Sequence, residues 1–246
     1  MKLEICANSL TSALNAQAGG ADRVELCSEL SLGGVTPSAG LIELVRARLS
    51  IEVFVLIRPR AGNFYYSNNE LEIIKNDILF CKKMGCDGVV IGALNRNGTV
   101  NIEAMRAFID LARPMKVTFH RAFDVCQEPI KSLNELIELG VDRVLTSGQQ
   151  PTAIEGIGLL EDLLKVAQTD IIILAGSGVN TENVAKFYEI GIPEIHFSAK
   201  KNLNPSFDIF VSNVKLEDKS YSYWESSEDV IRKMTMRIQN MKNDKN

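Results

Sequence analysis

The hydrophobic positions of the chain form short β-rich runs that alternate with amphipathic stretches. Four runs share one form, a glycine followed by two or three linking residues and a strand-like segment: "GADRVELC" from Gly20, "GCDGVVIGA" from Gly85, "GVDRVLTSG" from Gly140 and "GIPEIHFSA" from Gly191. Each glycine ends an amphipathic stretch, as a residue of positive φ does just after a helix. The β-branched and aromatic residues that follow are typical of strands. The pattern therefore predicts a repeated helix and strand unit.

Four further runs read as strands and lie between the glycine-led ones: "LEICA", "VFVLIRPR", "KVTFHRAFD" and "IIILAGSG". Helical stretches such as "LEIIKNDILFCKKMG" and "SLNELIELG" carry apolar residues every three to four positions. Strict alternation of strands and helices predicts a parallel sheet with right-handed crossovers. Eight such units favour an α/β fold of the TIM-barrel, (β/α)8 type, with an open doubly wound sheet as the alternative.

The length supports a single domain. The chain has 246 residues, of which 46% are hydrophobic, and one (β/α)8 barrel typically takes about 250 residues. We expect residues 1–246 to form one TIM-barrel domain, with the core barrel in 1–199. The regular repeat stops after that, so 200–246 are expected to hold a long loop, which includes the aromatic "YSYW", and a final helix near 227–241.

Charge and composition exclude several classes of function. The net charge is −4 and the sequence pI is about 5.4, which gives no basic surface for a nucleic acid. The start "MKLEICANSL" lacks the features of a signal peptide or a spanning helix, so we expect no membrane partner and a cytoplasmic location. The five cysteines show no CxxC spacing, and most are expected to be reduced thiols.

Polar residues within the strands share one parity, while their neighbours are apolar. Side chains two apart in a strand point the same way, so these residues are expected to face the barrel lumen: Glu4 and Cys6, Glu25 and Cys27, Arg58 and Arg60, Thr118, His120 and Asp124, and His196 and Ser198. Buried charges must be paired with one another or with a ligand. One interpretation is an ion-pair network that only fixes the strand register.

The other interpretation is a functional site, because these residues lie toward the carboxyl ends of their strands, where this fold builds its sites. Glu25, Arg58, His120 and Asp124 are the candidate catalytic residues. The planar donors of Arg58 and Arg60 suit a carboxylate or phosphate. In this interpretation His120, with Glu25 or Asp124, moves protons.

Small residues after the last strands indicate an anion site. In many barrels the loops after strands seven and eight hold a phosphate through backbone N–H groups, and glycine lets the backbone come close. The candidates are Gly176 and Gly178 in "AGSGV" and Ser198 in "FSAKK". Further ligand contacts are expected from Glu4, Arg60, Thr146, Ser147, Gly148 and His196. The alternative for the glycines is a plain tight turn.

Five segments, in order, resemble the signatures of the CutC family of copper homeostasis proteins: "EICANSLTSALNAQAGGADRVELCSELSLGGVTPSAGLI", "IRPRAGNFYYS", "VTFHRAFDV", "GVDRVLTSGQ" and "AGSGVN". The resemblance runs from about residue 3 to 199. It implies a cytosolic TIM barrel, a homo-oligomer such as a dimer or tetramer, and an association with copper tolerance. It also implies Cu(I) binding through cysteines that match Cys6 and Cys27.

The sequence leaves three functional hypotheses. The protein binds Cu(I), or it is an enzyme, or it is a scaffold that binds a metabolite without turnover. Cys6 and Cys27 fall on neighbouring strands about 4.8 Å apart, and thiolates select Cu(I). The same cysteines could pack as small hydrophobes, and nearby glutamates would oppose thiolate formation. The rival is an enzyme of isomerase, aldolase or lyase type that acts on a small phosphorylated or carboxylated molecule.

Overall fold

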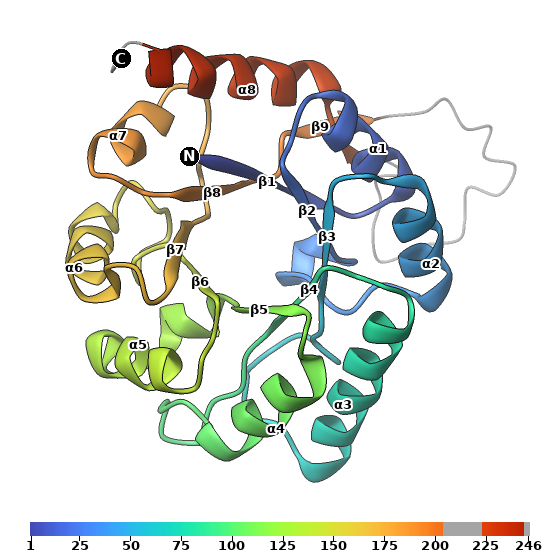
Figure 1. Ribbon diagram of the computed structural model, residues 1–246, viewed down its shortest axis with the longest axis vertical. Helices are drawn as coiled ribbons and strands as arrows, with labels where there is room; N and C mark the ends of the chain where they lie inside the picture. Colours follow the sequence, from blue (N-terminus) through green and yellow to red (C-terminus); the bar gives the residue numbers. More distant parts are fainter. Residues whose placement is uncertain (204–222, 244–246) are drawn as a thin grey trace, which may run out of the picture.

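The barrel closes completely. In a computed structural model, which describes residues 1–203 and 223–243, eight parallel strands surround a central axis (Figure 1). The strands are β1 (Lys2–Ala7), β2 (Arg23–Leu26), β3 (Glu52–Leu56), β4 (Gly88–Ile91), β5 (Lys116–Phe119), β6 (Arg143–Thr146), β7 (Ile172–Ala175) and β8 (Glu194–Phe197). Because β8 pairs with β1, the TIM-barrel prediction is confirmed and the open-sheet alternative is wrong.

The helices form an outer ring around the strands (Figure 1). They are α1 (Leu10–Ala18), α2 (Ala39–Arg48), α3 (Asn68–Lys83), α4 (Ile102–Ala112), α5 (Pro129–Glu138), α6 (Ile157–Ala167), α7 (Val184–Glu189) and α8 (Glu228–Asn243). Local sequence explains where they begin: the Ser67 hydroxyl and the Glu70 side chain form a reciprocal capping box at the start of α3. The four glycines that led the repeat all have positive φ.

The two faces of the sheet carry different residues, as the parity argument predicted. Apolar side chains such as Ile5, Val24 and Phe119 belong to the large core cluster shared with the helices. The lumen instead holds Phe54, whose ring centroid lies 4.7 Å from the guanidinium carbon of Arg23 and 4.7 Å from that of Arg143. A Cβ on Gly88 would lie 2.5 Å from that ring, so this strand position requires glycine.

A buried ion network fills the lumen below the carboxyl ends of the strands. Arg23 is 1% exposed, donates to Glu4 at 2.5 Å and also pairs with Glu194. Arg143 lies 3.3 Å from the same Glu194 carboxylate. The arginines expected in a register-fixing network, Arg58 and Arg60, take no part in it. Arg23 and Arg143 instead offset Glu4 and Glu194 from β1 and β8.

Two short strands lie at positions where the sequence predicted a loop. Strand β9 (Lys200–Leu203) pairs antiparallel with β10 (Tyr223–Ser226), while 204–222, which include Tyr221, lie outside the described residues. Helix α8 begins one residue after the predicted start and packs against α1 and α7 (Figure 1). None of the helices in the described ranges is long and apolar enough to cross a membrane.

Candidate functional site

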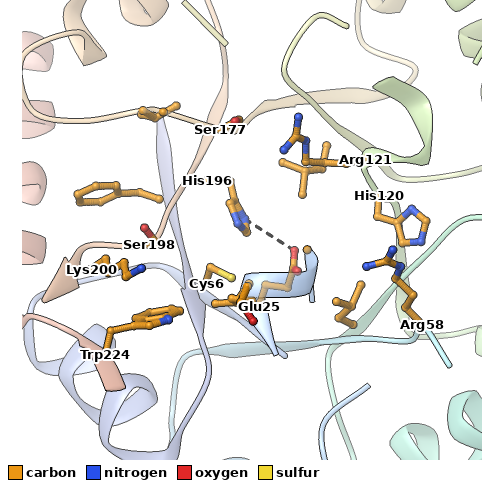
Figure 2. Close-up of a pocket in the computed structure, with 18 of the residues that line it drawn as sticks. Cys6, Glu25, Arg58, His120, Arg121, Ser177, His196, Ser198, Lys200 and Trp224 are labelled. Carbon is orange, nitrogen blue, oxygen red and sulfur yellow. Dashed lines mark ion pairs between the residues drawn. The ribbon is translucent and has the colours of Figure 1, made fainter. Parts of the chain in front are cut away.

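A cavity of about 470 Å³ opens at the carboxyl ends of the strands (Figure 2). Its floor consists of Cys6, Glu25 and His196, which we call the floor trio. One wall holds Arg58 and His120, and Figure 2 shows Lys200 and Trp224 on the opposite side. The volume is that of a small-molecule site, and its place agrees with the position of sites in this fold.

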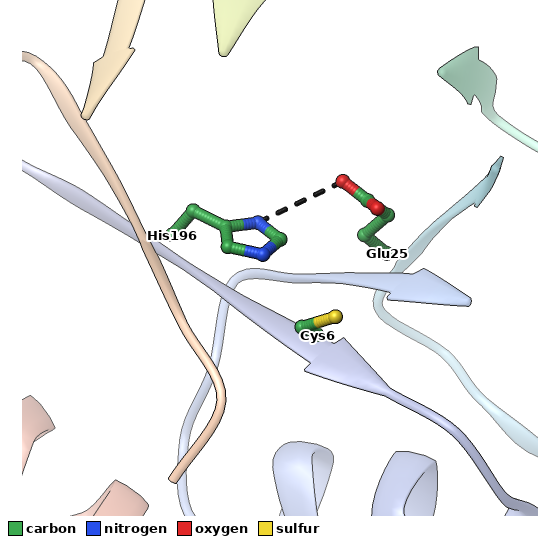
Figure 3. A group of neighbouring side chains, drawn as sticks. All are labelled: Cys6, Glu25 and His196. Atoms are coloured by element: carbon green, nitrogen blue, oxygen red, sulfur yellow. Dashed lines mark ion pairs between the residues drawn. The ribbon is translucent and has the colours of Figure 1, made fainter. Parts of the chain in front are cut away.

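The floor trio meets because β8, β1 and β2 are neighbours. The register sets Cys6 opposite Glu25 and Glu4 opposite His196. Figure 3 shows the three side chains converging from these strands, and their possible ligand atoms all lie within 4.8 Å of one another. The Sγ atoms of Cys6 and Cys27 are 3.4 Å apart, with Cys27 fully buried behind Cys6.

Glu4 lies under the floor and controls its charge. Its carboxylate accepts from Arg23 Nε at 2.5 Å and lies 2.7 Å from His196 Nδ1. Burial by itself would raise the pKa of Glu4, but the charge of Arg23 and the hydrogen bond with His196 outweigh it and lower the pKa to about 2. Glu4 is therefore an anion that fixes the orientation of the imidazole.

Burial acts differently on the other two ionisable groups. It raises the pKa of Glu25 to about 7, and the positive charge of His196 only partly opposes the rise. Burial would lower the pKa of His196, yet the charge of Glu25 and hydrogen bonds to Cys6 and Glu4 raise it well above the usual value. At neutral pH the imidazole is protonated and Glu25 is near its midpoint.

Cys6 is a neutral thiol rather than an activated nucleophile. The hydrogen bond with Cys27 and then burial raise the pKa of Cys6 well above its ordinary range. The Cys27 sulfur also lies 3.6 Å from the carbonyl of Ala7. The expectation that this environment opposes thiolate formation thus holds for Cys6, although the main cause is the second thiol rather than the glutamates.

His120 lines the cavity as predicted, but its surroundings do not favour the proton uptake that a base requires. Strand β5 ends at Phe119, and the Nδ1 atom of His120 accepts the N–H of Ala122 at 3.1 Å. Burial and the nearby charge of Arg58 lower the pKa of His120 to about 3. The neutral ring therefore carries its proton on Nε2, a buried atom without a partner among the described residues. His120 can donate a hydrogen bond but is a poor base at neutral pH.

Arg58 lines the cavity, but Arg60 does not. The guanidinium of Arg58 donates hydrogen bonds to the carbonyl oxygens of Leu32, Gly34 and Gly62. Its buried Nε has no partner among the described residues. Arg60 was predicted to contact the ligand, but it is not among the residues that line the cavity. Its guanidinium pairs with Glu70 at the start of α3, because β3 ends at Leu56 and the strand parity no longer applies.

Asp124 is also turned away from the cavity. The short helix η2 (Arg121–Val125) follows β5 and aims the carboxylate at the loop after β6, where it accepts from Thr146 Oγ1 at 2.5 Å and from the Ser147 N–H at 2.9 Å. Gly148 donates to the same Thr146 hydroxyl. These four residues form one loop network outside the cavity lining. Arg121 links this network to the cavity, because it donates to Asp124 and Ser147 and also lines the cavity.

The loops after β7 and β8 contribute four residues to the cavity lining whose backbone N–H groups are not used elsewhere in the described part of the chain. Ser177, Gly178, Val179 and Ser198 all line it, and no hydrogen bond within the described ranges occupies their N–H groups. We call these four amides the amide cradle. Gly176, expected to contact the ligand, has a steric role, because a Cβ there would lie 2.5 Å from Leu145. Thr118 is fully buried and its hydroxyl has no partner among the described residues.

Several residues at or below the site were not predicted. Arg23 and Glu194 have the parity of Glu25 and His196, so the alternation could have revealed them. The alternation along the barrel strands could not predict Lys200 and Trp224, because these residues reach the cavity from the paired strands β9 and β10. The Lys200 ammonium lies 5.5 Å from the Trp224 ring.

The closed barrel and the ligand-sized cavity at its carboxyl end define a TIM-barrel protein with a candidate small-molecule site. The CutC family model matches residues 1–201, and the chain therefore belongs to the CutC family. A family protein CutC of Bacteroides thetaiotaomicron is 46% identical over 90% of this chain and 87% of its own length. The copper homeostasis protein cutC homolog of Homo sapiens is 42% identical over 87% and 79%.

A solved structure agrees with this assignment. The crystal structure of the putative copper homeostasis protein CutC from Streptococcus agalactiae has a TM-score of 0.77 and 35% sequence identity. The likeness covers 80% of this chain and 98% of that protein. The expected family and barrel are thus confirmed together, over the part of the chain where the sequence resemblance was found.

Proposed function

We propose that Cys6 and Cys27 bind Cu(I) at the bottom of the cavity. The observation that supports this function best is the 3.4 Å distance between their Sγ atoms. Metal–thiolate bonds of about 2.3 Å, as in zinc sites, allow two sulfurs to lie up to about 4.6 Å apart around one ion. Paired soft thiolates select Cu(I) over hard cations. Cys6 lines the cavity and gives the ion a path to the pair.

The test is a titration of the reduced protein with Cu(I) against a competing chelator. In the Cys6→Ser, Cys27→Ser double variant, the affinity for Cu(I) should fall more than roughly 10–100-fold. That range is the usual effect of losing a residue that contacts only the metal's ligands. Binding to the wild type should tighten as pH rises through neutrality, because the metal must displace a proton from Cys6, a thiol of raised pKa.

The matched control is Cys126→Ser, which alters a buried cysteine that does not line the cavity. Its Cu(I) affinity should equal that of the wild type. Equal affinity in the double variant and the wild type would reject the cysteine pair as the copper site.

A second candidate function is the binding of a small phosphorylated or carboxylated molecule. The specific observation in its favour is the amide cradle, whose four residues line the cavity and whose N–H groups have no partners in the described ranges. Arg58, Arg121 and Lys200 line the same space, whereas Glu25 is its one acidic lining residue among those described. Free amides and cationic side chains together favour an anion.

The lining groups also suit the isomerase, aldolase or lyase chemistry expected from the sequence. Such reactions need a donor that polarises a carbonyl and a group that takes up a proton. The Nε2–H of His120 is the donor, since its Nδ1 is occupied by the Ala122 amide. Glu25 is the carboxylate nearest neutrality, with a pKa of about 7.

Fluorescence of Trp224 can test the anion site directly, because it is the single tryptophan of the chain and lines the cavity. Inorganic phosphate should change this emission in a saturable way. Arg121→Gln should weaken phosphate binding about 10-fold or more, the value of a hydrogen bond to a charged group. Arg106→Gln, on the exposed side of α4, should have no effect. Identical titrations for both variants would contradict the anion site.

A further inference from the structure

We propose that the floor trio of Cys6, Glu25 and His196 is a second metal site, which takes a divalent ion of the zinc class and leaves one coordination position open to the cavity. This inference does not depend on the Cu(I) site. The two sites share Cys6 but differ in every other ligand. Figure 3 shows the trio converging on one volume from β1, β2 and β8.

The distances fit an ion of this class. The candidate ligand atoms of the trio lie within 4.8 Å of one another. Zinc bonds to sulfur, nitrogen and oxygen of about 2.0–2.3 Å would require only a small closure of these side chains. One thiolate, one imidazole and one carboxylate form a borderline donor set, which suits Zn²⁺ or Co²⁺ better than Mg²⁺ or Cu(I).

The surroundings of the trio resemble the outer shell of a metal site. A metal-bound histidine usually gives its second ring N–H to a carboxylate, which fixes the ring and raises its basicity. His196 Nδ1 lies 2.7 Å from Glu4, and Glu4 is held in turn by Arg23 at 2.5 Å. This arrangement leaves His196 Nε2 for the ion.

The remaining observation concerns Glu25. Its Oε2 atom is buried and lies 3.7 Å from His196 Nδ1, but it accepts no hydrogen bond among the described residues. A buried carboxylate oxygen that accepts no hydrogen bond is costly unless a cation or a ligand completes it. Since the trio also lines the cavity, an ion held there would have three protein ligands and one position facing the cavity, the pattern of catalytic zinc sites.

Because Cys6 is shared, occupation by the divalent ion and by Cu(I) should exclude each other. The separate ligands allow the two sites to be distinguished: Cys27 belongs only to the Cu(I) pair, and Glu25 only to the trio. A variant at each position gives a crossed test in which the two metals respond in opposite ways.

The experiment uses the full-length, metal-free, reduced protein and Co²⁺ as the spectroscopic probe, with Zn²⁺ as the competitor. The wild type should show visible absorption of thiolate-bound Co²⁺ that Zn²⁺ removes. Glu25→Gln should weaken Co²⁺ binding beyond the roughly 10–100-fold effect of losing an outer-shell partner, while Cu(I) affinity stays within about threefold. In Cys27→Ser, Cu(I) affinity should fall by the larger factor, while Co²⁺ affinity stays within about threefold.

Two further variants keep the test decisive. Glu4→Gln should weaken Co²⁺ by about 10–100-fold as an outer-shell change, and Glu72→Gln, on an exposed face of α3, should change nothing. Thermal melts verify that each variant is folded. Equal Co²⁺ affinity in the wild type and Cys6→Ser would overturn the divalent site without affecting the Cu(I) result. Equal loss of Co²⁺ in Cys27→Ser and Glu25→Gln would overturn it as well.

Discussion

Replacement of Arg23 by methionine is expected to lower the free energy of unfolding by about 3–5 kcal/mol, the usual cost of leaving a buried charge without its partner. Arg23 is 1% exposed and holds both Glu4 and Glu194 in the lumen. It also stacks on Phe54. Without the guanidinium the two carboxylates are left with too little positive charge. Urea unfolding at neutral pH measures the loss.

Two comparisons make this result specific. Lys165→Met removes an exposed ion pair with Asp162, and such pairs contribute about 0–1 kcal/mol. Adding Glu194→Gln to Arg23→Met should recover part of the loss, because it removes one of the unpaired carboxylates. A loss below about 1 kcal/mol in Arg23→Met would show that the ion network does not hold the lumen together.

Substitution of Glu25 by glutamine is expected to flatten the pH dependence of stability of the metal-free protein. Burial raises the pKa of Glu25 from 4.5 to about 7, so between these values the folded state binds more protons than the unfolded state. The free energy of unfolding therefore falls as pH rises from 4.5 through 7. The difference of about 2.5 pH units corresponds to about 3 kcal/mol.

His196 should add to the same trend. Its folded pKa is raised well above 6.5, so its contribution to stability is present below pH 6.5 and is lost as pH rises through the folded pKa. Glu25→Gln should equal the wild type near pH 4.5 and exceed it in stability at pH 8. Urea unfolding across this range gives the comparison, and parallel curves for the two proteins would show that Glu25 ionises normally.

Strand parity predicts the direction of a side chain only as far as each strand extends. It placed Glu25, His196 and the cysteines correctly in the lumen, because β1, β2 and β8 are regular at those positions. It failed for Arg60 and Asp124, which follow the ends of β3 and β5, where the chain turns. An alternation of two residues holds only while the backbone stays extended.

The sequence alone determined the eight repeated units, the family and part of the set of chemistry-bearing residues, because hydrophobic periodicity and local turn signals are encoded along the chain. The protonation of those residues depended on contacts between distant strands. Arg23 and His196 make Glu4 an anion, while burial brings Glu25 near neutrality. The hairpin of β9 and β10 likewise brings Trp224 to the cavity. Charge and access at a site depend on neighbours in space, and only the closed barrel brings those neighbours together.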